Sequence, residues 1–245
     1  MTTLKNPASE SWQDPQKQLS RQIISQSMTH ILKVNKFPKT INSLSLPAHM
    51  WFFEVVLAAS NLARNFIFTG LEKNEEVLEN QIGESIKLNR CFPNASFIPY
   101  STTMPVDIET YLRMNTFLKY EIVYFDFMGN WSKEKEEWLE NIFISNGAKQ
   151  YILAFTTSVI RTHPTNQEKL EDYAELISKD LYKSRLNLGA LSEDSNSRNL
   201  YFYGVNGFIY KLAKKYKKEV KIQTPIEYRN KNGRLQIVFL YHIVN

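Results

Sequence analysis

Apolar runs alternate along the chain with amphipathic stretches, and this alternation predicts strands and helices in turn. Short runs rich in β-branched and aromatic residues predict strands at 43–48, 65–70, 95–99, 120–127 and 150–158. Helical spacing predicts helices at 19–34, 50–63, 74–89, 107–118 and 132–143. Five strands separated by four helices indicate βαβ units and a parallel sheet.

The last third of the chain follows a different pattern. A helix is expected over 167–183, a polar loop over 191–199 and a second helix over 203–217. Two strand-forming runs then occupy 220–245 around Asn232-Gly233, a dipeptide typical of hairpin turns. The expected fold is therefore α/β: a Rossmann-like, mostly parallel seven-stranded sheet with a C-terminal antiparallel hairpin.

The length and composition favour one large domain. The chain has 245 residues, of which 43% are hydrophobic, enough to fill a sizeable core. Prolines and serines interrupt any periodicity in residues 1–17, so we expect a loosely docked arm there. The expected division is an N-terminal arm and helix at 1–42 and a single domain at 43–245. The apolar runs are too short to cross a bilayer, which predicts a cytoplasmic protein without membrane contact.

The charge is moderately basic, with 30 Lys and Arg against 25 Asp and Glu. Six lysines fall within residues 211–221, and among them Lys214, Lys215 and Lys218 are candidate nucleic-acid contacts. The solvated face of a helix is the alternative interpretation of this run. Cys91 is the single cysteine, and no Cys/His cluster has the spacing of a metal site, so we expect neither an intrachain disulfide nor a metal.

The order of strands and helices, closing on a hairpin, resembles the class I S-adenosylmethionine-dependent methyltransferase fold over residues 43–245. The stretch YFDFMGNWS, followed by a helix and then YILAFTTSVIR, is also similar to methyltransferase-like proteins encoded by phages and other mobile elements. The resemblance implies a methyltransferase-like domain with S-adenosylmethionine as its cofactor.

Two acidic residues match positions at which that family holds the cofactor. The family's second strand ends in an acidic residue that receives the ribose hydroxyls, and Glu72 stands at this point. A carboxylate suits a vicinal diol because it accepts two hydrogen bonds. The fourth strand ends in Asp126, for which the resemblance implies a place at the mouth of the cofactor pocket and a catalytic role. The alternatives are a surface glutamate at Glu72 and a turn-capping carboxylate at Asp126.

The junction after the first strand departs from the family pattern. It reads SLPAHMWFFE, and no glycine precedes Gly70, although a glycine-rich turn normally lets the backbone approach the cofactor. His49 and Glu54 are the candidate substitutes at this junction, and Ser101 is a candidate for the adenine. A turn histidine without a ligand is the alternative for His49.

Two main function hypotheses follow. The first is a divergent S-adenosylmethionine-dependent methyltransferase with nucleic acid as a candidate acceptor. The alternative is a non-catalytic methyltransferase-like module that binds nucleic acid or a protein partner. A metal-dependent nuclease built on Glu54, Glu72 and Asp126 is a third and weaker hypothesis, because no paired carboxylate spacing marks a two-metal site.

Overall fold

The described part of the chain is built around one eight-stranded sheet. The computed structural model describes residues 14–46, 51–72, 75–101, 111, 119–127, 129–159, 167–177 and 193–245. The strand order is β3-β2-β1-β4-β5-β8-β6, with β7 also paired to β8. The strands are β1 (Thr40–Ser45), β2 (Asn65–Glu72), β3 (Ala95–Ser101), β4 (Ile122–Phe125), β5 (Gln150–Ser158), β6 (Glu219–Ile222), β7 (Ile226–Arg229) and β8 (Leu235–Val244).

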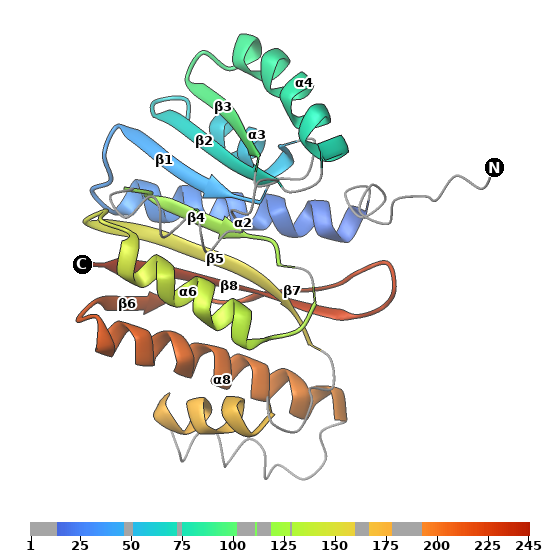
Figure 1. Cartoon of the computed structure of the whole chain (residues 1–245), viewed down its shortest axis with the longest axis vertical. Coiled ribbons are helices and arrows are strands. Elements are labelled where there is room, and N and C mark those ends of the chain that lie inside the picture. Colours follow the sequence, from blue (N-terminus) through green and yellow to red (C-terminus); the bar gives the residue numbers. More distant parts are fainter. Residues whose placement is uncertain are drawn as a thin grey trace, which may run out of the picture.

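The order of the strands reverses between β1 and β4. The chain steps outward from β1 through β2 to β3, then returns to the other side of β1 and continues through β4 and β5, all of them parallel. Such a reversal opens a crevice outside the carboxyl ends of the two central strands, where ligands of open α/β sheets bind. In Figure 1 these strand ends share one side of the molecule.

The C-terminal hairpin is confirmed, and it forms one end of the sheet. β8 is antiparallel to β5 from Ser158↔Gln236 to Gln150↔Val244. Its other edge pairs with β7 near one end and β6 near the other, so β6 and β7 act as one interrupted strand. The turn closes between Asn230 and Arg234, with Gly233 at φ 73, a backbone conformation that glycine adopts without a steric penalty. The fold class predicted from the sequence is therefore correct.

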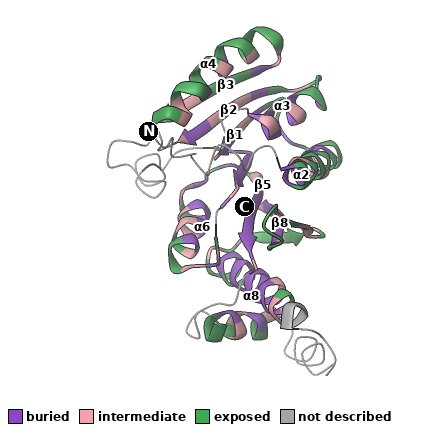
Figure 2. Ribbon diagram, turned by 90° about the vertical axis from the view of Figure 1, so that its right-hand side faces the viewer, coloured by how far each residue is buried: buried purple, intermediate pink, exposed green. Residues whose placement is uncertain are grey.

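Helices cover both faces of the sheet (Figure 2). They include α2 (Pro15–Val34), α3 (Phe52–Ala59), α4 (Glu75–Cys91), α6 (Lys133–Ser145) and α8 (Glu193–Lys215), and residues 167–177 are also helical. One core lies between the sheet and α2 and α3, and includes Met28, Leu57 and Tyr124. The second lies between the opposite face and α6 and α8, and includes Phe155 and Phe208.

Several element boundaries differ from the expected ones. The helix expected at 19–34 begins at Pro15, because the Asp14 side chain accepts from the Gln16 N–H and proline is favoured in the first helical turn, so residues 14–17 are not part of an arm. The loop expected at 191–199 is wrong from residue 193 onward, since α8 begins there; acidic residues at positions 193 and 194 suit a helix start.

Two further expectations concern the chain's organisation. Residue 42, the expected boundary between arm and domain, falls inside β1, and α2 contributes to the core beneath the sheet. The division into two parts stays a prediction. The helix expected over 107–118 lies almost entirely outside the described residues.

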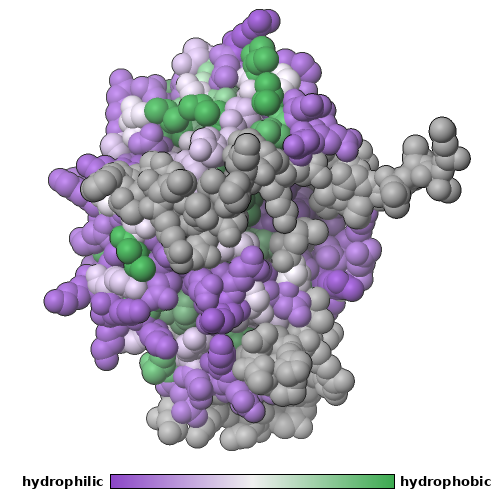
Figure 3. All heavy atoms as spheres, in the orientation of Figure 1, coloured by the Kyte–Doolittle hydropathy of each residue, from purple (hydrophilic) through white to green (hydrophobic). Residues whose placement is uncertain are grey.

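The surface is predominantly hydrophilic over α6 and α8, while hydrophobic side chains are more frequent near β3 and α4 (Figure 3). Ile82 and Ile86 of α4 and Ile98 of β3 are each more than two-fifths exposed. None of the described helices combines the length and the apolar character that a bilayer crossing requires.

We predict that Gly207 is required for the contact between α8 and the helix at 167–177. A Cβ atom at Gly207 would lie 1.8 Å from the carbonyl oxygen of Tyr173, so one of the two helices would have to shift. Gly207→Ala should lower the free energy of unfolding by about 1–3 kcal/mol in urea titrations. The control is Gly83→Ala in α4, where nothing lies within 4 Å of the added atom; it should be neutral or stabilising by about 0.5–1 kcal/mol. Equal effects of the two substitutions would contradict the prediction.

Candidate functional site

The strand pairing places Glu72 and Asp126 level with each other, at the carboxyl ends of the parallel strands where the strand order reverses. Gly70 pairs with Ser45, and Ser45 pairs with Tyr124, so these three residues form one row across β2, β1 and β4. Glu72 and Asp126 each lie two residues beyond this row, on strands separated only by β1. Two strand spacings correspond to about 10 Å between their backbones. Both candidate carboxylates thus belong to the same edge.

Asp126 forms two buried ion pairs with α2. Its Oδ2 atom lies 2.9 Å from Lys17 Nζ and 2.9 Å from Arg21 Nη2. The Asp126 side chain is 7% exposed, and those of Lys17 and Arg21 are 11% and 6% exposed. Alternation along β4 explains this contact, since Asp126 points to the same face as Tyr124, the face that α2 covers. The carboxylate at the end of β4 therefore holds the N-terminal half of α2 against the sheet.

The two cations also determine the ionisation of this group. Burial opposes the charge on Asp126, but Lys17 and Arg21 outweigh it and lower the pKa of Asp126 to about 2. Burial also acts to lower the pKa of Arg21, yet the neighbouring Asp126 carboxylate raises it overall. Asp126 is therefore ionised throughout the physiological pH range, and the cluster keeps one positive charge in excess.

Glu54 is turned into the same interface. It is 1% exposed, and its Oε1 lies 2.6 Å from the Ser45 hydroxyl at the end of β1. Burial raises the pKa of Glu54, although the hydrogen bond from Ser45 acts in the opposite direction. The side chain thus joins α3 to β1 inside the fold, a task that the sequence did not indicate.

Trp51 occupies the position before α3 with a left-handed backbone, at φ 50 and ψ 32. This conformation is unusual for a bulky residue and carries strain. The indole offsets it by packing edge-on against Phe97 and by donating from Nε1 to the Gln81 carbonyl oxygen at 3.4 Å. Trp51, the residue that precedes α3, is thus held in place by burial and by its contact with Phe97.

The loop after β4 is held by its own set of hydrogen bonds. The carbonyl oxygen of Gly129 accepts from the Ser158 N–H at 3.0 Å and from Lys135 Nζ at 2.8 Å. Burial lowers the pKa of Lys135 to about 8. Sequence reasoning missed Lys135, because its partner is a backbone carbonyl that carries no sequence signal.

The remaining candidate cofactor residues are only partly covered by the described residues. Glu72 is the last residue of β2, is partly exposed and pairs in register with Ser101 of β3. This register puts Ser101 at the same edge as Glu72. His49 lies outside the described residues. The predicted cofactor roles of Glu54, Glu72, Ser101, Asp126 and His49 stay predictions.

The lysines predicted as nucleic-acid contacts lie at the opposite end of the strands, where the parallel strands begin. β6 follows α8 directly, and Glu219 at its start pairs with Val244, which in turn pairs with Gln150 at the start of β5. Lys214 is exposed, but Lys215 lies 2.6 Å from Glu140, and Lys218 lies over the rings of Phe143 and Tyr151 at 5.5 and 5.3 Å. Their predicted role stays a prediction.

The nuclease hypothesis gains no support from this arrangement. Within the described ranges, no group of three or more His, Cys, Asp and Glu side chains is placed to hold a metal ion. Glu54 is bonded to Ser45, and Asp126 is bonded to two cations.

Comparisons with known proteins give only distant structural likenesses. No protein-family model matches the chain, and a search of curated proteins finds no relative. Among solved structures, Trm5b from Pyrococcus abyssi is 14% identical with a TM-score of 0.48, over 91% of this chain and 49% of its own. TYW2 from M. jannaschii in complex with AdoMet is 16% identical with a TM-score of 0.45, over 92% and 76%.

A third likeness is to the O-methyltransferase from Bacillus cereus in complex with SAH, which is 9% identical with a TM-score of 0.45, over 92% of this chain and 91% of that one. The chain spans about half the length of Trm5b. Identities and scores this low carry no conclusion about the activity of this chain. The similarity to phage proteins likewise stays a prediction.

We predict that Asp126 supports the fold through α2. Asp126→Asn would leave Lys17 and Arg21 buried without a counter-charge, which should cost roughly 3–5 kcal/mol of unfolding free energy. Replacing the whole cluster with apolar residues, as Lys17→Met, Arg21→Met and Asp126→Leu together, should recover most of this loss. Chemical denaturation of the two variants measures both effects. A change below about 1 kcal/mol for Asp126→Asn would contradict the assigned role.

The same ion pairs predict a specific acid sensitivity. Because the pKa of Asp126 is about 2 in the folded chain against an ordinary value of 3.8, the stabilisation is fully present above about pH 4 and is lost as the pH falls toward 2. Wild-type stability followed by circular dichroism should therefore fall by about 2 kcal/mol more over this interval than that of the apolar triple variant. Parallel acid profiles would be inconsistent with a paired Asp126.

Proposed function

We propose that the chain is a divergent S-adenosylmethionine-dependent methyltransferase that binds its cofactor at the carboxyl ends of β1, β2 and β3. The observation that carries the proposal is Glu72: it ends β2 beside the switch point, where the class I resemblance requires an acidic residue for the ribose. The sequence predicted that β2 ends at Gly70, whereas the strand extends to Glu72. Glu72 is therefore the last residue of the strand, which is the position that the resemblance gives to the acidic residue.

The residues at this edge fit the cofactor in part. Glu72 is assigned to the ribose hydroxyls, Ser101 on the neighbouring strand to the adenine, and His49 to the methionine end. Glu54 supports the end of β1 from inside through Ser45. Asp126 is assigned to the reacting end, where it also fixes α2 through Lys17 and Arg21.

Bound S-adenosylmethionine would supply an already activated methyl group. Little acid–base chemistry is then asked of the protein, because alignment of the acceptor with the methyl group provides most of the catalysis. Two interactions favour such alignment, because each restricts backbone motion next to Asp126. Lys135 donates to the Gly129 carbonyl oxygen, and Arg21 at the start of α2 forms an ion pair with Asp126.

The non-catalytic module is the second candidate function, and two observations favour it. The carboxylates of Asp126 and Glu54 are both engaged by residues of the chain itself, and the junction between β1 and α3 lacks glycine. A sheet edge whose polar groups already have partners needs no ligand to satisfy them. Nucleic acid or a protein would be the partner of such a module.

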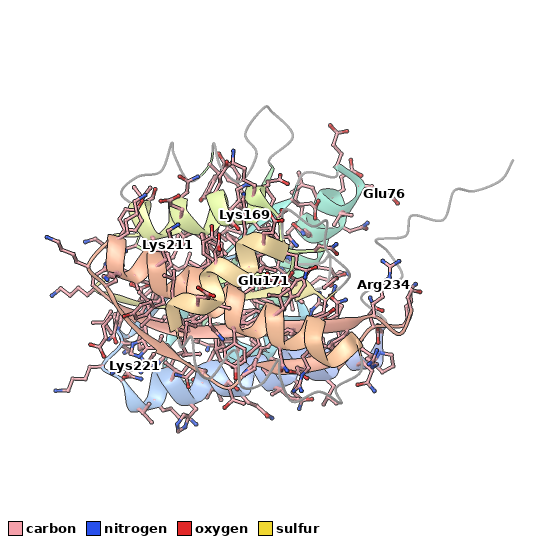
Figure 4. The ribbon with its side chains drawn as sticks, turned by 90° about the horizontal axis from the view of Figure 1, so that it is seen from below. Glu76, Lys169, Glu171, Lys211, Lys221 and Arg234 are labelled. Atoms are coloured by element: carbon pink, nitrogen blue, oxygen red, sulfur yellow. The ribbon has the colours of Figure 1, made fainter. Side chains whose placement is uncertain are left out.

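Calorimetric titration with S-adenosylmethionine separates the two functions. The transferase proposal predicts a measurable heat for the wild type and a Glu72→Ala variant that binds roughly ten- to a hundredfold more weakly, because hydrogen bonds to the carboxylate are lost. Glu76→Ala is the matched control: it removes the same charge from the exposed first turn of α4, which Figure 4 shows at the surface, and should bind as the wild type does.

Unfolding curves of both variants check that the folded fraction is unchanged. No heat and no thermal shift for the wild type at millimolar S-adenosylmethionine would sink the transferase proposal in favour of the non-catalytic module. Equal weakening by Glu72→Ala and Glu76→Ala would show that the ribose assignment is wrong.

A further inference from the structure

The turn between β7 and β8 lies at the carboxyl ends of the parallel strands, as Glu72 and Asp126 do. Gln236, just inside β8, pairs with Ser158 at the carboxyl end of β5, and the turn at 230–234 extends beyond this pair. The Lys231 N–H donates to Asp14 Oδ2 at 2.9 Å, which ties the turn to the first residues of α2. The hairpin is thus a neighbour of the proposed site.

This hairpin is strongly basic. Residues 226–236 contain Arg229, Lys231 and Arg234 against the single carboxylate of Glu227, a local charge of +2. All three cations are exposed residues. Arg198 of α8 lies 2.7 Å from Glu227 and adds a further positive charge, whereas Asp14, which accepts from the Lys231 N–H, adds a negative one. Lys17 and Arg21 beside Asp126 leave one more in excess.

The backbone of the turn is organised in advance. Asn230 Oδ1 accepts from the N–H groups of Asn232 and Arg234 at 3.0 and 3.1 Å, and Arg229 Nη1 donates to the Gly233 carbonyl oxygen at 2.8 Å. A surface that is already ordered loses less conformational entropy when it binds. The exposed cations therefore lie on a turn whose backbone is already ordered.

The lysines of 211–221 are separated from this edge by the length of the sheet. β5 has nine residues, and at about 3.3 Å per residue its two ends are about 25–30 Å apart. Figure 4 agrees, with Arg234 toward one end of the molecule and Lys211 and Lys221 toward the other. An acceptor held at the proposed site would therefore meet the hairpin first.

We propose that the β7–β8 hairpin is the nucleic-acid contact surface of the chain, with Lys231 and Arg234 binding backbone phosphates. The inference rests on the proposed function for the identity of the acceptor and site, but its measurement requires no cofactor. Phosphodiester groups are the ligand because clustered Lys and Arg side chains on an ordered turn recognise them without reading sequence.

The test uses fluorescence anisotropy with labelled single-stranded RNA and duplex DNA of equal length, titrated over a range of salt concentrations. Lys231→Glu with Arg234→Glu should weaken binding at least tenfold. A Lys231→Gln, Arg234→Gln pair should lower the salt slope by about 0.7–0.9 for each phosphate that is no longer neutralised. Arg229 is left unchanged because it holds the turn. The matched control, Lys211→Glu with Lys221→Glu, reverses the same charge at the amino ends of the parallel strands, where both residues are exposed, and should keep wild-type affinity and slope.

Three outcomes would overturn the proposal. The first is that the wild type binds neither probe, as expected for a surface that serves an acidic protein. The others are a control variant that loses as much affinity as the hairpin variant, and an unchanged salt slope in the glutamine pair.

Calorimetry with S-adenosylmethionine on the same samples keeps the two proposals apart. Hairpin-dependent binding without cofactor heat would remove the transferase and leave the nucleic-acid surface, whereas cofactor heat without nucleic-acid binding would do the reverse.

Discussion

The buried ion pairs of Asp126 with Lys17 and Arg21 are the constraint on which the candidate site depends. They attach α2, which precedes the first strand, to the carboxyl end of β4 at the point where the strand order reverses. The C-terminal half of α2 is held differently, by apolar residues such as Met28 and Leu32 in the core. Two distinct forces thus fix one helix, and only the electrostatic one acts at the site. Because both cations are buried, loss of the single carboxylate would leave them without compensation.

β8 is the second organising element, since it determines where the basic surfaces lie. One edge of β8 pairs with β5 along nine residues, and the other carries β6 and β7. Its antiparallel direction places the hairpin turn at the carboxyl ends of the parallel strands and the start of β6 at their amino ends. Among the described residues, two basic regions therefore lie at opposite ends of the parallel strands. Of these two described regions, the hairpin is the one that adjoins the groups assigned to the cofactor, a distinction that composition alone does not make.

The sequence predicted the elements well where local signals were strong. The bounds of β5 agree with the expected strand, and Asn232-Gly233 lies in the hairpin turn. It failed where a polar stretch belongs to a helix, as at 193–199, and where Asp14 and Pro15 mark an early helix start. It also did not identify the partners of Asp126, because Arg21 lies 105 positions away and is brought near by the packing of α2 on the sheet. A carboxylate at a strand end indicates a polar environment, but the topology decides whether a ligand or a helix supplies it.

Trp51, the residue before α3, shows how the start of this helix is held at an edge whose sequence has no glycine. A glycine-rich turn allows a ligand to approach the backbone closely, and it does so by leaving the turn without side chains. Here the residue before α3 is Trp51, whose left-handed backbone is maintained because its side chain is fully buried against Phe97. The start of α3 is thereby held from the core side, and Ser45 and Glu54 are bonded to each other. The polar groups that end β1 and open α3 are thus occupied within the fold, and the proposed function accordingly assigns cofactor recognition to Glu72 at the end of β2.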